Sequence, residues 1–176
     1  MKPALLVIDL QVQLVAAAGD GDAVIARVAG LVECAHDAAV PVLFIQHDDT
    51  GPWLVPGTPG WQIEPRLGRR AGDPVIRKRA CDAFYGTSLG LELTGRKIDR
   101  LVICGMQTEF CVDTTVRRAI GEHYPVTLVA DGHTTLDNAV LPAAQIVRHH
   151  NATLDGFGTE DAVVTLAPAA EIRFGA

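Results

Sequence analysis

Short apolar runs recur along the chain and predict six strands that are buried on both faces. Residues 3–9 and 41–47 are the clearest, because branched side chains fill them almost without interruption and each run ends on a polar residue. The other runs are 75–77, 100–104, 125–130 and a weaker one at 161–166. Continuous apolar runs of this kind are typical of a parallel sheet with helices on both faces.

Helical periodicity fills the intervals between these runs. Apolar residues of 24–35 recur every three or four positions, so they share one face of a helix that Asp22 would cap. Shorter helical patterns cover 87–93, 109–123 (with Thr108 as N-cap) and 138–150 (with Pro142 in the first turn). The alternation predicts a single α/β domain over residues 1–176: a three-layer α/β/α sandwich with a mostly parallel, Rossmann-like six-stranded sheet.

Composition narrows the classes of function. With 48% apolar and 20% charged residues, the chain has the composition of a globular protein that can bury a full core. A formal net charge of −6 and the absence of a basic run argue against nucleic acid as a partner, and no apolar stretch reaches membrane-spanning length. The four cysteines lack paired or zinc-like spacing, so we expect reduced thiols and a cytoplasmic location.

In a parallel α/β sheet, ligands bind beyond the carboxyl ends of the strands, where the strand order reverses. That rule directs attention to the polar residues that follow strands: Asp9, His47, 77–85, 105–111 and 131–133. The long segment 48–73 also starts at this edge and contains prolines, glycines and two tryptophans. Because long loops in compact domains are usually functional, we expect substrate specificity to reside there.

The segment 105–112 places a cysteine where it can react. It follows a buried strand and opens a helix, so Cys111 would lie in the first turn among unpaired backbone N–H groups. This environment lowers the pKa of a thiol and offers donors to a developing oxyanion. Glu109 in the same turn opposes the pKa shift, so a second positive group is needed. The alternative is that Cys111 is a small core residue.

Asp9 and Lys78 supply the charges that such a thiol requires. Asp9 closes the first strand, where a desolvated carboxylate needs a nearby cation to stay ionised, and Lys78 after the third strand is that candidate cation. Each also has a simpler interpretation: Asp9 as a helix cap or a hydrogen-bonding residue of the next loop, and Lys78 as a solvated surface lysine. Together with Cys111 they make a nucleophile, a base and a charge-orienting group.

These residues resemble the isochorismatase-like cysteine hydrolases, a superfamily that includes nicotinamidases and N-carbamoylsarcosine amidase-like enzymes. The resemblance covers nearly the whole chain in the right order. It rests on Val-Ile-Asp-Leu-Gln at 7–11, on Lys78 with Phe84, Thr87 and Leu89 downstream, on Gly-x-x-Thr-x-x-Cys-Val at 105–112, and on Ala-Asp at 130–131. A weaker resemblance to the streptothricin-hydrolase-like branch rests on 46–48, 56–61 and 107–111.

The resemblance implies specific roles. Cys111 is the nucleophile, Asp9 the general base and acid, and Lys78 the third member of a catalytic triad. A cis peptide bond is expected between Met106 and Gln107, with the N–H groups of Gln107 and Cys111 forming the oxyanion hole. The implied reaction is hydrolysis of an amide-type C–N bond of a small molecule through a thioester, and relatives of this kind are usually homodimers or higher homo-oligomers.

Other residues near the same edge are candidates for substrate binding: Gln11, Trp61, Phe84, Tyr85, Phe110 and His133. The nicotinamidase branch carries an Asp-x-His metal site after the second strand, whereas this chain has His-Asp-Asp at 47–49. We therefore expect neither a metal nor another cofactor. Two alternatives to catalysis remain: a non-catalytic binding or assembly member of the same fold, and a thiol redox sensor in which Cys81 pairs with Cys111.

Overall fold

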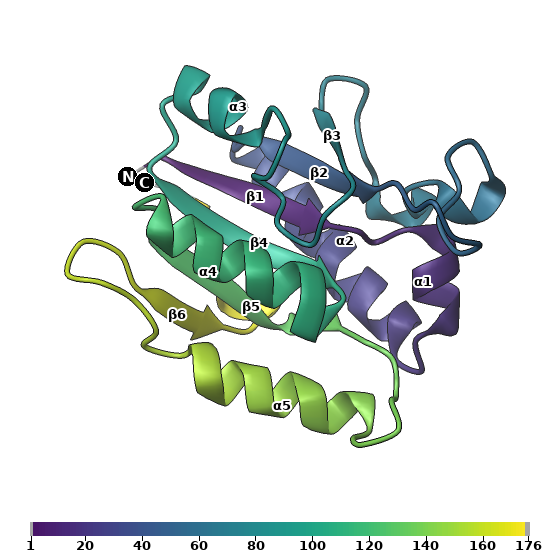
Figure 1. Cartoon of the computed structure of the whole chain (residues 1–176). Coiled ribbons are helices and arrows are strands. Elements are labelled where there is room, and N and C mark those ends of the chain that lie inside the picture. Colours follow the sequence, from purple (N-terminus) through teal and green to yellow (C-terminus); the bar gives the residue numbers. More distant parts are fainter. Residues whose placement is uncertain (1, 175–176) are drawn as a thin grey trace.

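A computed structural model describes residues 2–174 of the chain. One sheet contains six strands in the order β3-β2-β1-β4-β5-β6, and all five neighbouring pairs are parallel (Figure 1). The predicted α/β fold is thus confirmed. The strands are β1 (Pro3–Ile8), β2 (Val42–His47), β3 (Val75–Lys78), β4 (Arg100–Met106), β5 (Val126–Thr134) and β6 (Val164–Ala167).

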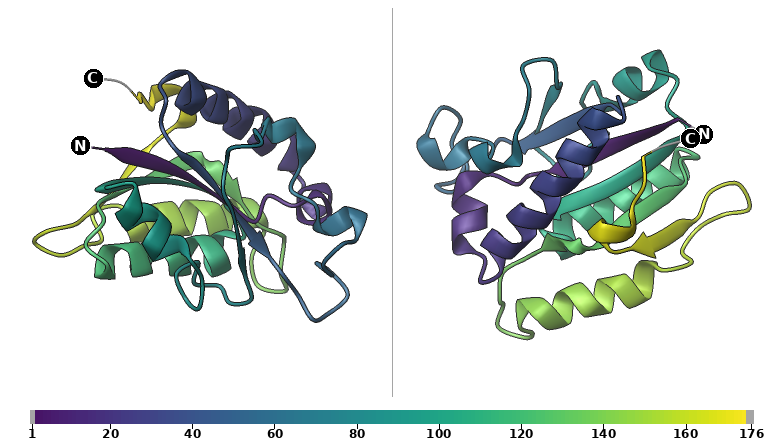
Figure 2. Two further views of the ribbon diagram at one scale, coloured as in Figure 1. Left: turned by 90° about the horizontal axis from the view of Figure 1, so that it is seen from above. Right: turned by 180° about the vertical axis from the view of Figure 1, so that it is seen from behind.

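Helices cover both faces of the sheet, as Figures 1 and 2 show. One face carries α1 (Val12–Ala17) and α2 (Gly21–Asp37), and the other carries α3 (Leu89–Gly95), α4 (Asp113–Gly121) and α5 (Ala143–Leu154). Short helical turns complete the chain at Pro59–Trp61, Pro65–Leu67, Thr108–Val112 and Ala169–Glu171. The strands therefore lie in the middle of three layers, which explains why their sequences are apolar at almost every position.

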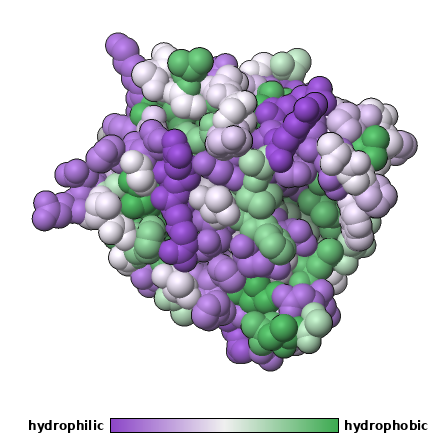
Figure 3. Space-filling model, in the orientation of Figure 1, coloured by the Kyte–Doolittle hydropathy of each residue, from purple (hydrophilic) through white to green (hydrophobic). Residues whose placement is uncertain are grey.

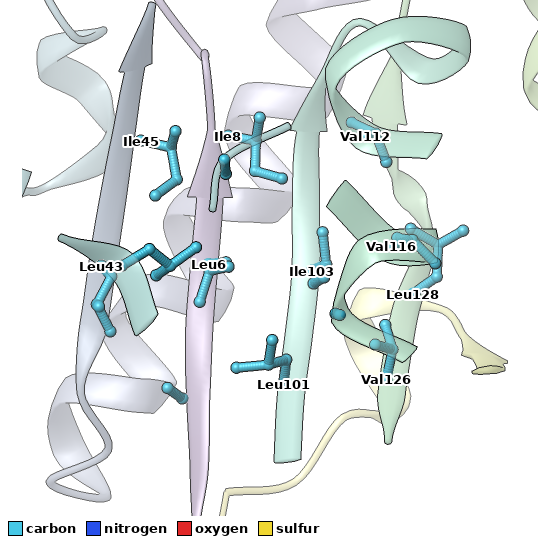
Figure 4. Close-up of a cluster of buried hydrophobic side chains, with 14 of the residues drawn as sticks. Leu6, Ile8, Leu43, Ile45, Leu101, Ile103, Val112, Val116, Val126 and Leu128 are labelled. Atoms are coloured by element: carbon cyan, nitrogen blue, oxygen red, sulfur yellow. The ribbon is translucent and has the colours of Figure 1, made fainter. Parts of the chain in front are cut away.

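Alternate residues of each strand enter different halves of the core. In β1, Leu6 and Ile8 pack toward α3 and α4, whereas Leu5 and Val7 pack toward α1 and α2. Figure 4 shows the first half, in which side chains from β1, β2, β4 and β5 meet Val112 and Val116. Burial on both sides fixes the register of the strands, so the ends of β1, β2, β3 and β4 are placed reproducibly at one edge.

Several helix boundaries differ from those predicted. The pattern at 138–150 begins as an irregular segment, because Asn138 Oδ1 accepts the amides of Val140 and Leu141 and Asp137 accepts that of Ala143. Consequently α5 starts at Ala143, after Pro142. Local side-chain hydrogen bonds outweighed helical periodicity here.

The predicted helix 109–123 is interrupted at its start. Its first turn is a π-helical turn over Thr108–Val112, and the regular helix α4 begins only at Asp113. The N-cap is Gln107, while Thr108 is the first residue of the turn. Helix α1 was not predicted. The N-cap position of α2 is Asp20, two residues before Asp22, and its side chain makes no capping hydrogen bond.

The surface over α3, α4 and α5 mixes polar and apolar side chains (Figure 3). Apolar residues gather at the lower right of this view, over the segment that leads into α5. Among residues 2–174, no helix combines the length and the apolar character that crossing a membrane requires.

Candidate active site

A cavity of about 350 Å³ opens at the carboxyl ends of the strands, on the side to which the arrows of β1, β2 and β4 point in Figure 1. The strand order reverses here, since β1 is flanked by β2 and β4, and this is the crevice that the sheet topology favours for ligands. The lining residues are Asp9, Leu14, His47, Asp49, Trp53, Leu54, Cys81, Gln107, Phe110, Cys111 and Leu136.

Three neighbouring strands bring the charged residues to this cavity. Asp9 directly follows β1 with φ 48°, a left-handed conformation that aspartate tolerates better than most residues. His47 ends β2 and Lys78 ends β3, and the two are paired in register. Asp9 and Lys78 are almost completely buried. The simpler interpretation of Lys78 as a solvated lysine is therefore wrong.

Lys78 connects the polar groups of the site. Its Nζ lies 2.6 Å from Asp9 Oδ2, 3.0 Å from His47 Nδ1 and 3.1 Å from Cys111 Sγ. It also donates to the carbonyl of Ala80 at 3.0 Å. Burial lowers the pKa of Lys78, but the negative charge of Asp9 and the Cys111 sulfur outweigh it and raise that pKa above its usual value. Lys78 is therefore an ammonium at neutral pH.

Gly105 permits the close approach that brings Cys111 to Asp9. It lies inside β4 with φ 133°, and a Cβ there would come within 2.0 Å of the Ile8 carbonyl oxygen. Only glycine therefore fits beside the last residue of β1. β4 continues one residue beyond Gly105, to Met106.

The segment after β4 presents Cys111 through an unusual backbone. The peptide bond between Met106 and Gln107 is cis, at the position that the family resemblance implies. The carbonyl of Gln107 accepts the amides of Phe110 at 3.2 Å and Val112 at 3.1 Å, which closes the π-helical turn. Cys111 is thereby held at the cavity, with its sulfur in contact with the ammonium of Lys78.

The protonation of Cys111 differs from the expectation. Burial, followed by the negative charge of Asp9, raises the pKa of the Cys111 thiol far above its usual value, and Lys78 only partly offsets them. The resting site thus contains a protonated thiol beside the ion pair of Asp9 and Lys78. Asp9 Oδ1 has no hydrogen-bond partner within residues 2–174, so an acceptor is free for the thiol proton.

The sequence placed His47 at the functional edge of the sheet and gave it no catalytic role. Burial and the positive charge of Lys78 lower the pKa of His47, so the ring is neutral, and its Nδ1 accepts from the ammonium. One potential ligand atom each from Asp9, His47 and Cys111 lies within 4.8 Å of the others. The Lys78 ammonium contacts all three groups, so this set does not suit a metal ion.

Of the six predicted substrate-binding residues, Phe110 lines the cavity and is 49% exposed. Gln11 is fully buried: its Nε2 donates to the carbonyls of His47 and Trp61, and its Oε1 accepts the amide of His47. Trp61 lies outside the lining and donates from Nε1 to Asp48 at 3.0 Å. Gln11 and Trp61 therefore fix the loop after β2.

The other three candidates also lie outside the lining. Phe84 stacks on Tyr124 with ring centroids 6.3 Å apart, and Tyr85 is 71% exposed beside a separate surface pocket. His133 is buried, its Nδ1 pairs with Thr108 Oγ1 at 2.9 Å and its Nε2 with Asn151 Oδ1 at 2.9 Å. Burial lowers the pKa of His133, so its ring is neutral. Through these two hydrogen bonds the ring links the π-helical turn that contains Cys111 to α5.

Sequence reasoning did not single out five of the eleven residues that line the cavity. Leu14 comes from α1, while Asp49, Trp53 and Leu54 come from the start of the long segment after β2 and Leu136 from the segment after β5. The edge rule had pointed to His47 and to this long segment, but of the segment's two tryptophans we chose Trp61, whereas Trp53 lines the cavity. Cys81 also lines the cavity.

Comparison with known proteins agrees with this geometry. The family model described as "Isochorismatase domain" matches residues 3–155. The chain belongs to the isochorismatase family. It is similar to a solved isochorismatase from Pseudomonas putida KT2440, with a TM-score of 0.88 and 31% identity over 97% of this chain and 90% of that one. The suspected superfamily is therefore confirmed.

Curated relatives include enzymes. Streptothricin hydrolase of Streptomyces noursei is 35% identical over 145 residues, which is 80% of this chain and 56% of that protein. N-carbamoylsarcosine amidase of an Arthrobacter species is 30% identical over 122 residues, 58% of this chain and 46% of that protein. The chain spans about half the length of these curated relatives.

Proposed function

We propose that the chain is a cysteine-dependent amidohydrolase that cleaves an amide-type C–N bond of a small molecule through a thioester intermediate. The observation that carries the proposal is the set of contacts from Lys78 Nζ to Asp9 and Cys111 at the bottom of a cavity. A scaffold protein needs no such buried charges, whose desolvation is costly. The names of the two relatives, a hydrolase and an amidase, also support it.

The first half of the reaction makes the thioester. Asp9 accepts the proton of Cys111 Sγ, and the thiolate attacks the carbonyl carbon of the amide. The N–H groups of Gln107 and Cys111 stabilise the oxyanion, and Lys78 stabilises the negative charge that passes between Asp9 and the sulfur. The C–N bond then breaks as Asp9 returns the proton to the nitrogen, and the amine or ammonia leaves.

The second half releases the acid. Asp9, again a carboxylate, takes a proton from a water molecule that attacks the thioester carbonyl carbon. The second tetrahedral intermediate collapses with the sulfur as leaving group, and the proton returns from Asp9 to Cys111 Sγ. The net reaction adds one water across the C–N bond and restores the resting thiol.

The test is a panel of small primary amides, lactams and carbamoyl compounds, scored by release of ammonia or amine. We expect Cys111→Ala to abolish hydrolysis and Cys81→Ser, which changes another cysteine of the same cavity, to retain it. Rapid quenching followed by intact-mass measurement should detect an acyl group on Cys111. Undiminished hydrolysis by Cys111→Ala would overturn the proposal.

The redox-sensor alternative has one observation in its favour, because Cys81 and Cys111 line the same cavity. Hydrogen peroxide would oxidise both thiols to a disulfide and release two molecules of water. A raised Cys111 pKa disfavours this chemistry, since the thiolate is the reactive form. A binding or assembly role would leave the contacts between Lys78, Asp9 and Cys111 without a purpose.

The proposal includes a homo-oligomer with reduced cysteines in the cytoplasm. Trp53 and Phe110 support the first part, because both line the cavity and yet remain about half exposed, at 45% and 49%. Apolar rings at such a rim suit contact with a second subunit. Size-exclusion chromatography with light scattering would measure the oligomeric state.

A further inference from the structure

The charges around the cavity do not balance. Asp9 is paired with Lys78, while Cys111 and His47 are neutral for the reasons given above. Asp49 is the other carboxylate in the lining, and no lysine or arginine among the described residues belongs to the lining. The cavity therefore carries about one uncompensated negative charge.

The Asp49 carboxylate is held in place at the cavity wall. Its Oδ1 accepts the amide of Gly51 at 2.8 Å, and its own amide donates to the carbonyl of Leu54 at 3.0 Å. Its Oδ2 has no hydrogen-bond partner within residues 2–174. The neighbouring Asp48 differs, because Arg77 and Trp61 both bind its carboxylate.

The rest of the wall suits an organic cation. Trp53 and Phe110 contribute aromatic rings, whose faces attract an ammonium or guanidinium group. Leu14, Leu54 and Leu136 supply apolar surface for a short carbon chain. Asp49 is partly buried, and a charge in such surroundings acts more strongly than it does in bulk solvent.

We propose that Asp49 forms a cation subsite of this cavity and that the substrate is a small amide carrying a positively charged group such as an ammonium. This inference rests on the proposed amide hydrolysis at Cys111. The subsite selects the charge of the substrate, and the Cys111 site performs the reaction. Anionic amides are rejected because Asp49 repels them.

The first experiment measures how the charge of Asp49 affects the reaction of Cys111 with charged reagents, and it does not require the substrate. The rates at which iodoacetamide (neutral), iodoacetate (anionic) and 2-bromoethylamine (cationic) alkylate Cys111 are followed by peptide mass spectrometry, with Cys111→Ala as background. Ratios between reagents cancel any change in the thiolate fraction. We expect Asp49→Asn to raise the ratio of the iodoacetate rate to the iodoacetamide rate by about three- to tenfold. The ratio of the 2-bromoethylamine rate to the iodoacetamide rate should fall.

The variants distinguish an effect of the Asp49 charge from an effect of a changed turn around Asp49. Asparagine keeps an Oδ1 acceptor for the Gly51 amide, so Asp49→Asn removes the charge and retains the turn. Asp49→Ser also keeps an acceptor and should give the same change. Asp155→Asn removes one charge from an exposed position outside the lining and should leave both ratios unchanged. Unchanged ratios in both Asp49 variants, or equal changes in Asp155→Asn, would overturn the inference.

The second experiment compares three amides of similar size: β-alaninamide, butanamide and succinamate, which are cationic, neutral and anionic. We expect kcat/KM to fall in that order and the cation-to-neutral ratio to drop about three- to tenfold in Asp49→Asn. Hydrolysis without any charge preference would overturn the cation subsite and leave the proposed function intact. If none of the three is hydrolysed, the alkylation ratios alone decide whether the subsite exists.

Discussion

The stability of the fold depends on the buried ion pair between Lys78 and Asp9, and replacing Lys78 tests that dependence. Methionine has a similar length but no charge, so Lys78→Met would leave the buried Asp9 carboxylate without its cation. The two side chains are 0% and 1% exposed, and the ion pair is 2.6 Å long. Solvent therefore cannot replace the lost partner.

The size of the effect follows from that burial. Removing one member of a buried ion pair typically costs about 3–5 kcal/mol. Domains of this kind are stable by roughly 5–15 kcal/mol, so we expect Lys78→Met to lose a large share of the free energy of unfolding. Asp9→Asn/Lys78→Met removes both charges, and asparagine tolerates the φ of 48° at this position. The double variant should therefore recover most of the lost stability.

Urea unfolding followed by the fluorescence of Trp53 and Trp61 measures these differences. With a slope of about 2 kcal/mol/M, the midpoint of Lys78→Met should fall by roughly 2 M. The double variant should lie much closer to the wild type, although it should not hydrolyse amides. A midpoint of Lys78→Met close to that of the wild type, or a double variant as unstable as the single one, would refute the reasoning.

Two further variants test the site. Next to burial, the charge of Asp9 is the main cause of the raised pKa of Cys111, and Asp9→Asn removes that charge. Iodoacetamide should therefore alkylate Cys111 from a lower pH, while the rate of hydrolysis falls about 10²-fold or more. An unchanged pH profile of alkylation would contradict this. Gly105→Ala should lower the free energy of unfolding in urea by about 2–5 kcal/mol, because the added Cβ overlaps the Ile8 carbonyl. Gly30→Ala is the control: this glycine lies in α2 with open space around it, so the variant should be as stable as the wild type or more stable. Equal midpoints for the two glycine variants would argue against the close approach of β4 to β1.

The strand pattern was readable from the sequence because burial on both faces leaves little room for polar residues. Runs such as 3–9 and 41–47 correspond to β1 and β2 within a residue. Helix starts were less readable, since they depend on hydrogen bonds such as those of Asn138 and Asp137 with nearby amides. Periodicity does not record such local competition.

The sequence by itself determined the fold class and the edge of the sheet where polar residues collect, because both follow from local apolar patterns and from the parallel strand order. It also put forward Asp9, Lys78 and Cys111, largely through resemblance. Only the tertiary structure decided that Lys78 contacts both of the others and that Phe110 faces the cavity while Gln11 and His133 do not. Such distances and orientations depend on how distant segments pack, and no local pattern encodes them.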